Sequence, residues 1–108
     1  MKKTVQELFD AMPASFHPEA AAGLDAVYQF DITGEGGGQW YAAVKDGSCE
    51  IAAGRHASPS ATITSKASDY LAIANGQKNE MMAFALGKIK VSGNIPAAMK
   101  LNKIFKRR

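Results

Sequence analysis

Cysteine and histidine are the side chains most often used for nucleophilic or metal chemistry, and this 108-residue chain has few of them. It contains Cys49, His17 and His56 and no further residue of either type. A Cys–His pair can form an activated nucleophile if the fold brings the two together, whereas a metal site needs several ligands at short spacings. No such spacing occurs here. Cys49 alternates with Ile51 and Ala53, which is typical of a small residue buried in a strand. The sequence therefore predicts neither a catalytic nor a metal site.

A glycine-rich segment at residues 34–38 is the second candidate for chemistry, because glycine loops can cradle phosphate. A phosphate loop runs from a strand into a helix N-terminus and is followed by a lysine and a hydroxyl residue. Here the segment lies between two predicted strands, and no Lys-Ser or Lys-Thr pair follows. We interpret it as a hairpin loop and expect no cofactor.

Five carboxylates lie on or beside predicted strands and turns, as solvent-facing residues do. None has an apolar sequence context that would raise its pKa for acid–base work. They are Asp25, Asp31, Glu35, Asp46 and Glu50. With no catalytic group of residues in view, we expect a protein that is not an enzyme.

The charge is distributed unevenly along the chain. Residues 88–108 carry seven basic and no acidic residues, while the remainder carries six basic and ten acidic ones. Nucleic-acid binding needs basic residues interleaved with exposed aromatic residues, but the aromatic residues here lie on early strands beside acidic neighbours. We therefore expect no nucleic-acid partner. The basic C-terminal end suits either an anionic membrane or a solvated helix end.

Length and composition predict a single domain over residues 1–108. The chain contains no apolar run near the ~20 residues of a membrane span and no signal-peptide core after Lys2 and Lys3. A single cysteine excludes an internal disulfide. These features favour a soluble, cytoplasmic protein.

The N-terminal half combines short helices with strands. Thr4 and Glu7 form a capping box, and Pro13 ends the helix that follows. A second short helix is predicted between Pro18 and Gly23. Alternating apolar residues then predict four strands that form an antiparallel meander. Their ranges are 26–33, 39–45, 48–53 and 61–64, with an Asp46-Gly47 hairpin turn between the second and third.

The C-terminal half returns to helices. Ser65 is expected to cap a helix that ends at Asn75-Gly76, and a helix over 80–86 follows. The strand 88–92 must cross back to an edge of the sheet, and Asn94 caps a last helix over 95–106. The predicted order is α-α-β-β-β-β-α-α-β-α. This is an α+β fold with a five-stranded, mostly antiparallel sheet and helices on one face.

The stretch 81–105 carries more apolar surface than one-sided packing in a domain of this size requires. Without a catalytic group elsewhere, this surplus points to binding of an apolar ligand.

The chain resembles the sterol carrier protein-2 (SCP2) sterol-binding family over roughly residues 16–105. An early part of the match is YQFDITG at 28–34, then QWY at 39–41 and Asp46-Gly47. The later part is Tyr70-Leu71, Asn75-Gly76, the strand 89–93 and the last helix. The order and spacing of these pieces carry the resemblance.

The resemblance implies a non-enzymatic carrier whose hydrophobic tunnel, between sheet and helices, holds a sterol, fatty acid, fatty acyl-CoA or isoprenoid lipid. The last helix is short, terminal and tethered at one end, so we expect it to act as a gate. Its surplus apolar surface predicts that Ile104→Asp would weaken lipid binding more than stability. From its charge, we expect the basic C-terminus to make transient contact with anionic membrane. By position, the implied lining is Trp40, Leu71, Met82, Phe84, Leu86, Ile89, Val91, Met99, Leu101, Ile104 and Phe105.

Two other functions remain open at this point. The domain could be an accessory factor that holds isoprenoid-quinone intermediates for biosynthetic enzymes. It could also be a protein-interaction domain with a vestigial cavity, although its many alanines leave room for a ligand.

Overall fold

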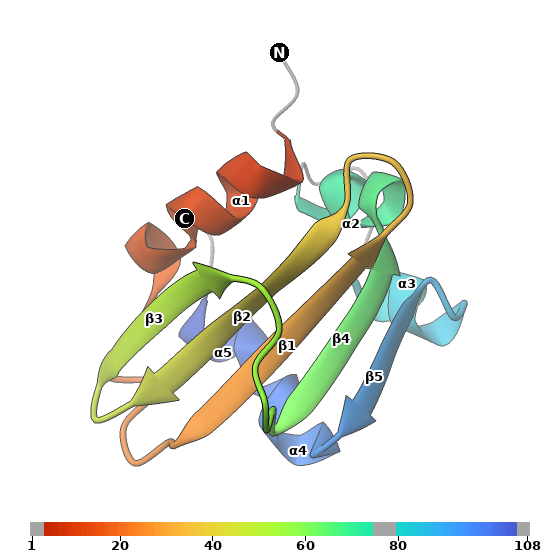
Figure 1. The fold of residues 1–108 in the computed structure, drawn as a ribbon. Coiled ribbons are helices and arrows are strands. Elements are labelled where there is room, and N and C mark those ends of the chain that lie inside the picture. Colours follow the sequence, from red (N-terminus) through yellow and green to blue (C-terminus); the bar gives the residue numbers. More distant parts are fainter. Residues whose placement is uncertain (1–3, 75–79, 106–108) are drawn as a thin grey trace.

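The computed structural model describes residues 4–74 and 80–105, and within them a five-stranded sheet forms one layer of the molecule (Figure 1). The spatial order of the strands is β3-β2-β1-β4-β5. The strands are β1 (Ala26–Thr33), β2 (Gly38–Lys45), β3 (Ser48–Ala53), β4 (Ala61–Lys66) and β5 (Ile89–Gly93). All five predicted strands are present, and β5 lies at an edge as expected.

The position of β4 differs from the predicted meander. It does not pair with β3 but lies on the other side of β1, where it runs parallel to β1 with Phe30 opposite Ile63. The pairs β1–β2, β2–β3 and β4–β5 are antiparallel. The sheet is therefore mixed, and the prediction that the first four strands are antiparallel neighbours is wrong for β4.

The connection from β3 to β4 crosses the face of the sheet opposite the helices. Buried Gln29, in β1, fastens it: its Nε2 donates to the carbonyl of Gly54 at 3.1 Å, and its Oε1 accepts from the amide of His56 at 2.8 Å. Arg55 forms an ion pair with Asp31 at 3.0 Å. These bonds hold the crossover over β1 and β2. They account physically for the parallel pairing that strand periodicity alone does not specify.

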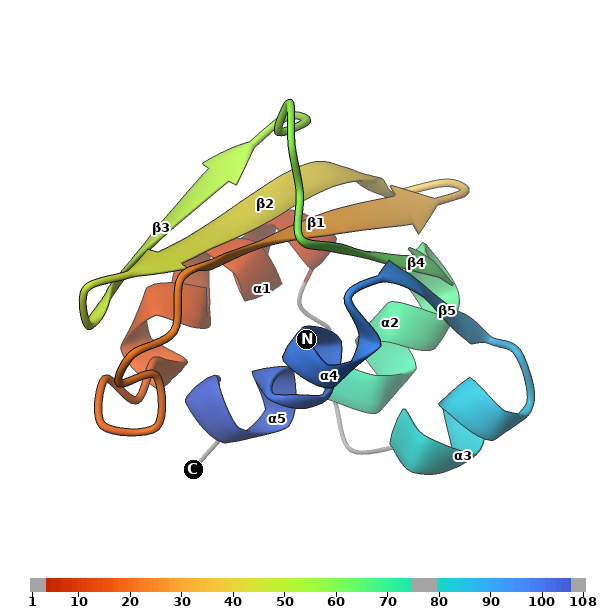
Figure 2. The same cartoon turned by 90° about the horizontal axis from the view of Figure 1, so that it is seen from below.

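The helices cover one face of the sheet, as predicted (Figure 2). Helix α1 and the 3-10 helix η1 lie toward β2 and β3, α2 lies against β1 and β4, and α3 and α4 flank β5. Their bounds are α1 (Val5–Ala11), η1 (Met12–Ser15), α2 (Ala67–Ala74), α3 (Glu80–Ala85), α4 (Ile95–Met99) and α5 (Leu101–Ile104).

The start of α1 is the predicted capping box, with the amide of Glu7 donating to the Thr4 hydroxyl at 3.2 Å. The predicted helix between Pro18 and Gly23 is wrong, since this segment consists of successive turns. The turns close through bonds such as that from the amide of Ala20 to the carbonyl of His17 at 3.1 Å, and they place Ala21 in the core.

Two helix boundaries also differ from prediction. Ser65 does not cap α2 but lies within β4, because pairing with both Ile32 and Ile89 extends that strand. The predicted last helix divides at Lys100 into α4 and α5. Asn94 does cap α4, accepting from the amide of Ala97 at 3.0 Å. The predicted helix end at Asn75-Gly76 lies outside the described residues.

Candidate functional site

The helix-facing side of the sheet carries a row of large apolar side chains. Strand register places Trp40 opposite Phe30, Phe30 opposite Ile63, and Ile63 opposite Val91. The next row runs from Ala42 through Tyr28 and Ala61 to Gly93, and every residue in it except Tyr28 is small. Alternation along each strand puts both rows on the same face. The sheet thus presents a continuous apolar floor with small residues beside large ones.

At the β2 end of this floor, three aromatic rings form a stack. The ring of Phe9, from α1, lies 4.6 Å from Trp40 and 5.6 Å from Tyr70, nearly parallel to both. The buried Trp40 Nε1 has no hydrogen-bond partner. Burial raises the pKa of the Tyr70 hydroxyl well above its usual value. The stack closes this end of the floor and leaves one unused donor, the indole N–H.

The other end of the floor is covered by α4 and α5. The Tyr28 hydroxyl donates to the carbonyl of Ala97 at 2.8 Å, and the amide of Asn94 donates to the carbonyl of Ser60 at 2.9 Å. Ala97 and Ala98 are buried beneath α4. These short side chains let the helix approach the sheet closely.

The far end of this helical segment is also attached. Phe105 forms an antiparallel bridge with Phe16, their rings lie 5.5 Å apart, and the amide of His17 donates to the carbonyl of Ile104 at 2.7 Å. The expectation of a gate tethered at one end is therefore wrong. Ile104 is 0% exposed, so its side chain belongs to the packed interior.

The eleven predicted lining residues occupy three environments. Trp40 and Ile104 are buried. Five are partly buried and pack against the core, namely Leu71, Ile89, Val91, Leu101 and Phe105. Four are largely exposed, namely Met82 at 64%, Phe84 at 45%, Leu86 at 67% and Met99 at 53%. The structure thus brings seven of them to the space between sheet and helices and places four on the outer surface.

Several contributors to this region were absent from the predicted set. Phe9, Phe16 and Tyr70 supply aromatic surface from the N-terminal segment and α2. Phe9 follows Val5 at helical spacing, which marks both as the buried side of α1 but not as neighbours of Trp40. Sequence spacing shows which face is buried, not which element it meets.

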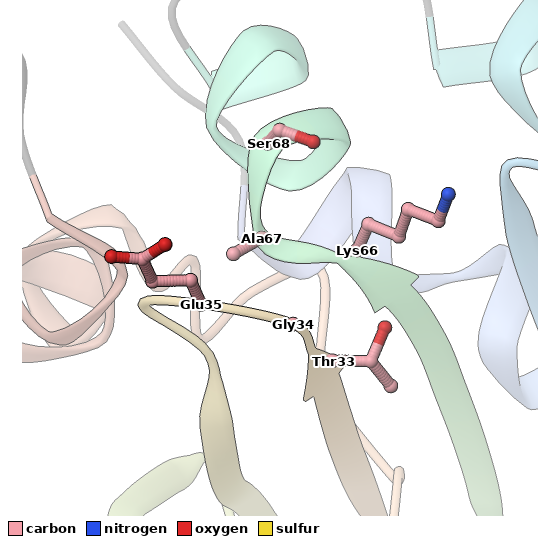
Figure 3. Close-up of a pocket in the computed structure, with 6 residues that line it drawn as sticks. All are labelled: Thr33, Gly34, Glu35, Lys66, Ala67 and Ser68. Atoms are coloured by element: carbon pink, nitrogen blue, oxygen red, sulfur yellow. The ribbon is translucent and has the colours of Figure 1, made fainter.

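A separate groove lies where β1 and β4 end (Figure 3). It has a volume of about 280 Å³ and is lined by Thr33, Gly34, Glu35, Lys66, Ala67 and Ser68. Figure 3 shows the ends of the Glu35 and Lys66 side chains on opposite sides of Ala67. Ligand pockets usually measure about 300–1,000 Å³. The groove is slightly smaller and contains none of the predicted lining residues.

The candidates for nucleophilic chemistry remain weak within the described residues. Burial raises the pKa of the Cys49 thiol, which favours the unreactive protonated form. His56 Nδ1 accepts from the amide of Ser58 at 3.0 Å, and His17 lies 3.4 Å from Glu19. In the part of the chain that is described, no group of three or more metal-ligating residues occurs. Nor does any helix there have the length and apolar character needed to cross a bilayer.

Several curated proteins contain a segment that is similar to nearly the whole of this chain. The chain is 34% identical over 102 residues to mouse (Mus musculus) hydroxysteroid dehydrogenase-like protein 2, covering 94% of this chain and 21% of that protein. It therefore spans about a fifth of the length of the curated relatives it first matches.

Solved structures share the fold over nearly the whole chain. The solution structure of palmitated SCP2-like 2 from Aedes aegypti matches with a TM-score of 0.75 and 27% identity, covering 98% of this chain and 97% of that one. A ubiquinone synthesis protein, UbiJ-SCP2, matches with a TM-score of 0.70 at 10% identity, covering 92% and 90%. This second likeness shows the fold alone.

The family assignment follows from the sequence itself. The profile of the SCP-2 sterol transfer family matches residues 5–106, nearly the whole chain. The strand order, the one-sided helical layer and the apolar floor agree with that match. This chain belongs to the SCP-2 sterol transfer family.

Proposed function

We propose that the chain is a non-enzymatic lipid carrier that holds one lipid with a long acyl or isoprenoid chain between the sheet and the C-terminal helices. The observation that carries this proposal is the layer of half-buried apolar side chains on that side. Here Leu71, Leu101 and Phe105 stay partly accessible beside the floor, which leaves apolar surface for a ligand to cover.

Burial of the acyl chain alone can supply most of the binding free energy, so little recognition of the headgroup is needed. Each methylene removed from water contributes about 0.8 kcal/mol, so a sixteen-carbon chain contributes roughly 12 kcal/mol before costs. Association and ordering oppose this by about 4–15 kcal/mol. Micromolar affinity is therefore reachable with apolar contacts alone. This agrees with a site that has almost no polar residues.

The predicted lining residues take two places in this proposal. The half-buried group contacts the lipid chain, and the buried Trp40 and Ile104 pack behind it. Met82, Phe84, Leu86 and Met99 form the outer rim, where the exposed side chains meet a ligand as it enters. Methionine suits this role because its flexible thioether adapts to several ligand shapes.

The ligand class is best tested on the protein itself. Gently purified protein is measured by native mass spectrometry, and bound lipid is then extracted and identified. A fatty acid, acyl-CoA or sterol near one-to-one supports the carrier role. An isoprenoid quinone or its precursor favours the accessory role in quinone biosynthesis. A bare protein that also takes up none of these on titration contradicts lipid binding and favours the interaction-domain function.

Two neighbouring residues of β5 offer a matched test of the site. Val91 faces the helices and is half-buried, whereas Ser92 is exposed on the opposite face. Val91→Gln is expected to weaken fatty-acid binding about tenfold or more by placing an amide against the acyl chain. Ser92→Gln is the control and is expected to bind as the parent protein does. Fluorescence of Trp40, the single tryptophan, reports binding, and circular dichroism confirms the fold.

A further inference from the structure

Strand β5 forms one edge of the sheet, and its outer side pairs with no strand in the described part of the chain (Figure 1). An edge strand leaves a row of backbone N–H and C=O groups to which another strand can bond. The opposite edge of the sheet is β3. The two edges differ in charge, and this difference indicates what kind of strand each one can accept.

The register between β4 and β5 shows which backbone groups of β5 point outward. The amide of Asn94 donates to the carbonyl of Ser60 at 2.9 Å, which makes this a hydrogen-bonded pair. Bonded and non-bonded pairs alternate along an antiparallel ladder, so the backbone groups of Lys90 and Ser92 bond to β4. The N–H and C=O groups of Val91, between them, therefore point away from β4 and toward the unpaired side.

The two faces of this edge differ in chemistry. Ile89 and Val91 face the helices and remain half-buried, and α3, with its exposed Phe84, packs on the same side of β5 (Figure 2). Lys90 lies on the opposite face and is exposed. A strand added beside β5 has apolar neighbours on one face and a lysine on the other. This favours a segment in which apolar residues alternate with polar ones.

The polar face of the edge is positively charged. Lys88 and Lys90 are exposed, and exposed Lys66, at the end of β4, lies on the same face as Lys90. The first carboxylate in the row through Lys90 is Asp31, two strands away, and it already pairs with Arg55 at 3.0 Å. Within the described residues none of the three lysines forms an ion pair. An acidic side chain on an added strand would therefore meet uncompensated positive charge.

The edge at β3 does not offer this combination. That strand carries exposed Glu50 and no lysine, so an acidic strand would be repelled there. Pairing of β5 with the β5 of a second copy is also disfavoured, because it would gather the lysines of both copies on one face. The charge of β5 thus matches an acidic partner strand and not another copy of itself.

We propose that β5 binds an extended acidic segment of a partner protein as an added strand of the sheet. The segment alternates apolar and acidic residues over the five-residue length of β5. Its backbone bonds to Val91, its acidic side chains lie beside Lys90, and its apolar side chains cover Ile89 and Val91. This inference goes beyond the proposed carrier function and does not depend on a bound lipid.

The probe for this site is a short fluorescent peptide that alternates valine and glutamate, and fluorescence anisotropy measures its binding. Lys90→Glu is expected to weaken binding about tenfold or more, because it places like charges side by side. Lys45→Glu, the same charge change at the exposed end of β2, is the control and should alter binding less than about twofold. Lys90→Glu should bind fatty acid as the parent does, which separates this test from those of the carrier function.

A second peptide tests the alternation itself. It has the same composition, but its valines and glutamates stand in separate blocks, so it cannot place all of its charges on one face of a strand. We expect it to bind at least about tenfold more weakly than the alternating peptide. Equal binding of the two peptides, or no binding of the alternating one, overturns the proposal.

Amide hydrogen exchange followed by NMR shows where the peptide binds. We expect the Val91 amide to exchange rapidly in the free protein and slowly with saturating peptide, while Lys90 and Ser92, already bonded to β4, change little. Peptide binding without protection of Val91 overturns the proposal, because the peptide then lies elsewhere. A Val91 amide that is protected before peptide is added also overturns it, because a second copy or another part of the chain then covers the edge.

Discussion

The hydroxyl of Tyr28 in β1 donates a 2.8 Å hydrogen bond to the carbonyl of Ala97 in α4, joining residues 69 positions apart. Tyr28 is fully buried and lies in the second row of the apolar floor, between Ala42 and Ala61. The bond thereby ties the helical cover to the centre of the sheet. It is a polar contact on the helix-facing side of the sheet.

Tyr28→Phe removes this bond and keeps the ring. We expect the free energy of unfolding to fall by about 1 kcal/mol, because the Ala97 carbonyl still accepts from the amide of Lys100 at 3.1 Å. Urea unfolding followed by circular dichroism measures the change. A loss of several kcal/mol would mean that the hydroxyl has a larger role than this single bond.

Alkaline pH is expected to destabilise the fold through its buried tyrosines. Burial raises the pKa of Tyr28 and of Tyr70 above the ordinary value of 10.0. Above about pH 10 the unfolded chain releases these protons while the folded chain retains them, so stability is constant below that pH and falls above it. The midpoint of urea unfolding, measured from pH 8 to 11, checks the slope. The double variant Tyr28→Phe/Tyr70→Phe should lose less stability over that range, and an unchanged slope would contradict this origin.

Gln29 should be among the most sensitive polar positions. Its amide is 0% exposed and bonds to Trp40, Gly54 and His56. Gln29→Met keeps the length but leaves buried backbone groups without partners, and we expect a loss of about 2–4 kcal/mol. The matched control is Gln39→Met at an exposed position of β2, where the change should be below about 0.5 kcal/mol. Equal effects at the two positions would show that the crossover does not depend on Gln29.

Gly93 is required where β5 turns into α4. Its φ is +87°, and a Cβ there would lie 2.6 Å from the carbonyl oxygen of Ser60, which accepts from Asn94. Gly93→Ala should cost about 3 kcal/mol or more, because strain and steric overlap add. Gly87 has a φ of +75° but open space around it, so Gly87→Ala should cost only about 1–2 kcal/mol. The difference in melting temperature between the Gly93→Ala and Gly87→Ala variants measures the cost of the steric overlap at Gly93. Equal melting temperatures would contradict that cost.

Ile104→Asp should act on folding and not selectively on lipid binding, contrary to the expectation from the sequence. The side chain is fully buried, and an unpaired carboxylate there is costly. We expect no cooperative unfolding transition, or one shifted by several kcal/mol. Lys103→Asp on the same helix is exposed and should fold normally. A folded Ile104→Asp protein with a normal midpoint would restore the mobile-gate interpretation.

The amino-acid sequence by itself determined most of the secondary elements and which side of each strand is apolar, but it wrongly predicted a helix between Pro18 and Gly23. Alternation located β1, β2, β3 and β5 to within about a residue, because a half-buried strand needs an apolar residue at every second position. The Thr4 capping box and the Asp46-Gly47 turn could also be predicted, because each depends only on residues a few positions apart in the sequence. The family resemblance then led to the prediction that the surplus apolar surface in the C-terminal stretch binds a lipid.

Tertiary structure alone decided how these elements meet. The parallel pairing of β4 with β1 depends on a crossover held by Gln29, which is 25 residues from Gly54. The anchoring of α5 depends on the bridge between Phe16 and Phe105. Periodicity shows that Ile104 and Met99 are both apolar, but only the packed fold makes Ile104 core and leaves Met99 exposed. Such differences arise from contacts between distant segments, whose partners are not encoded in any local pattern.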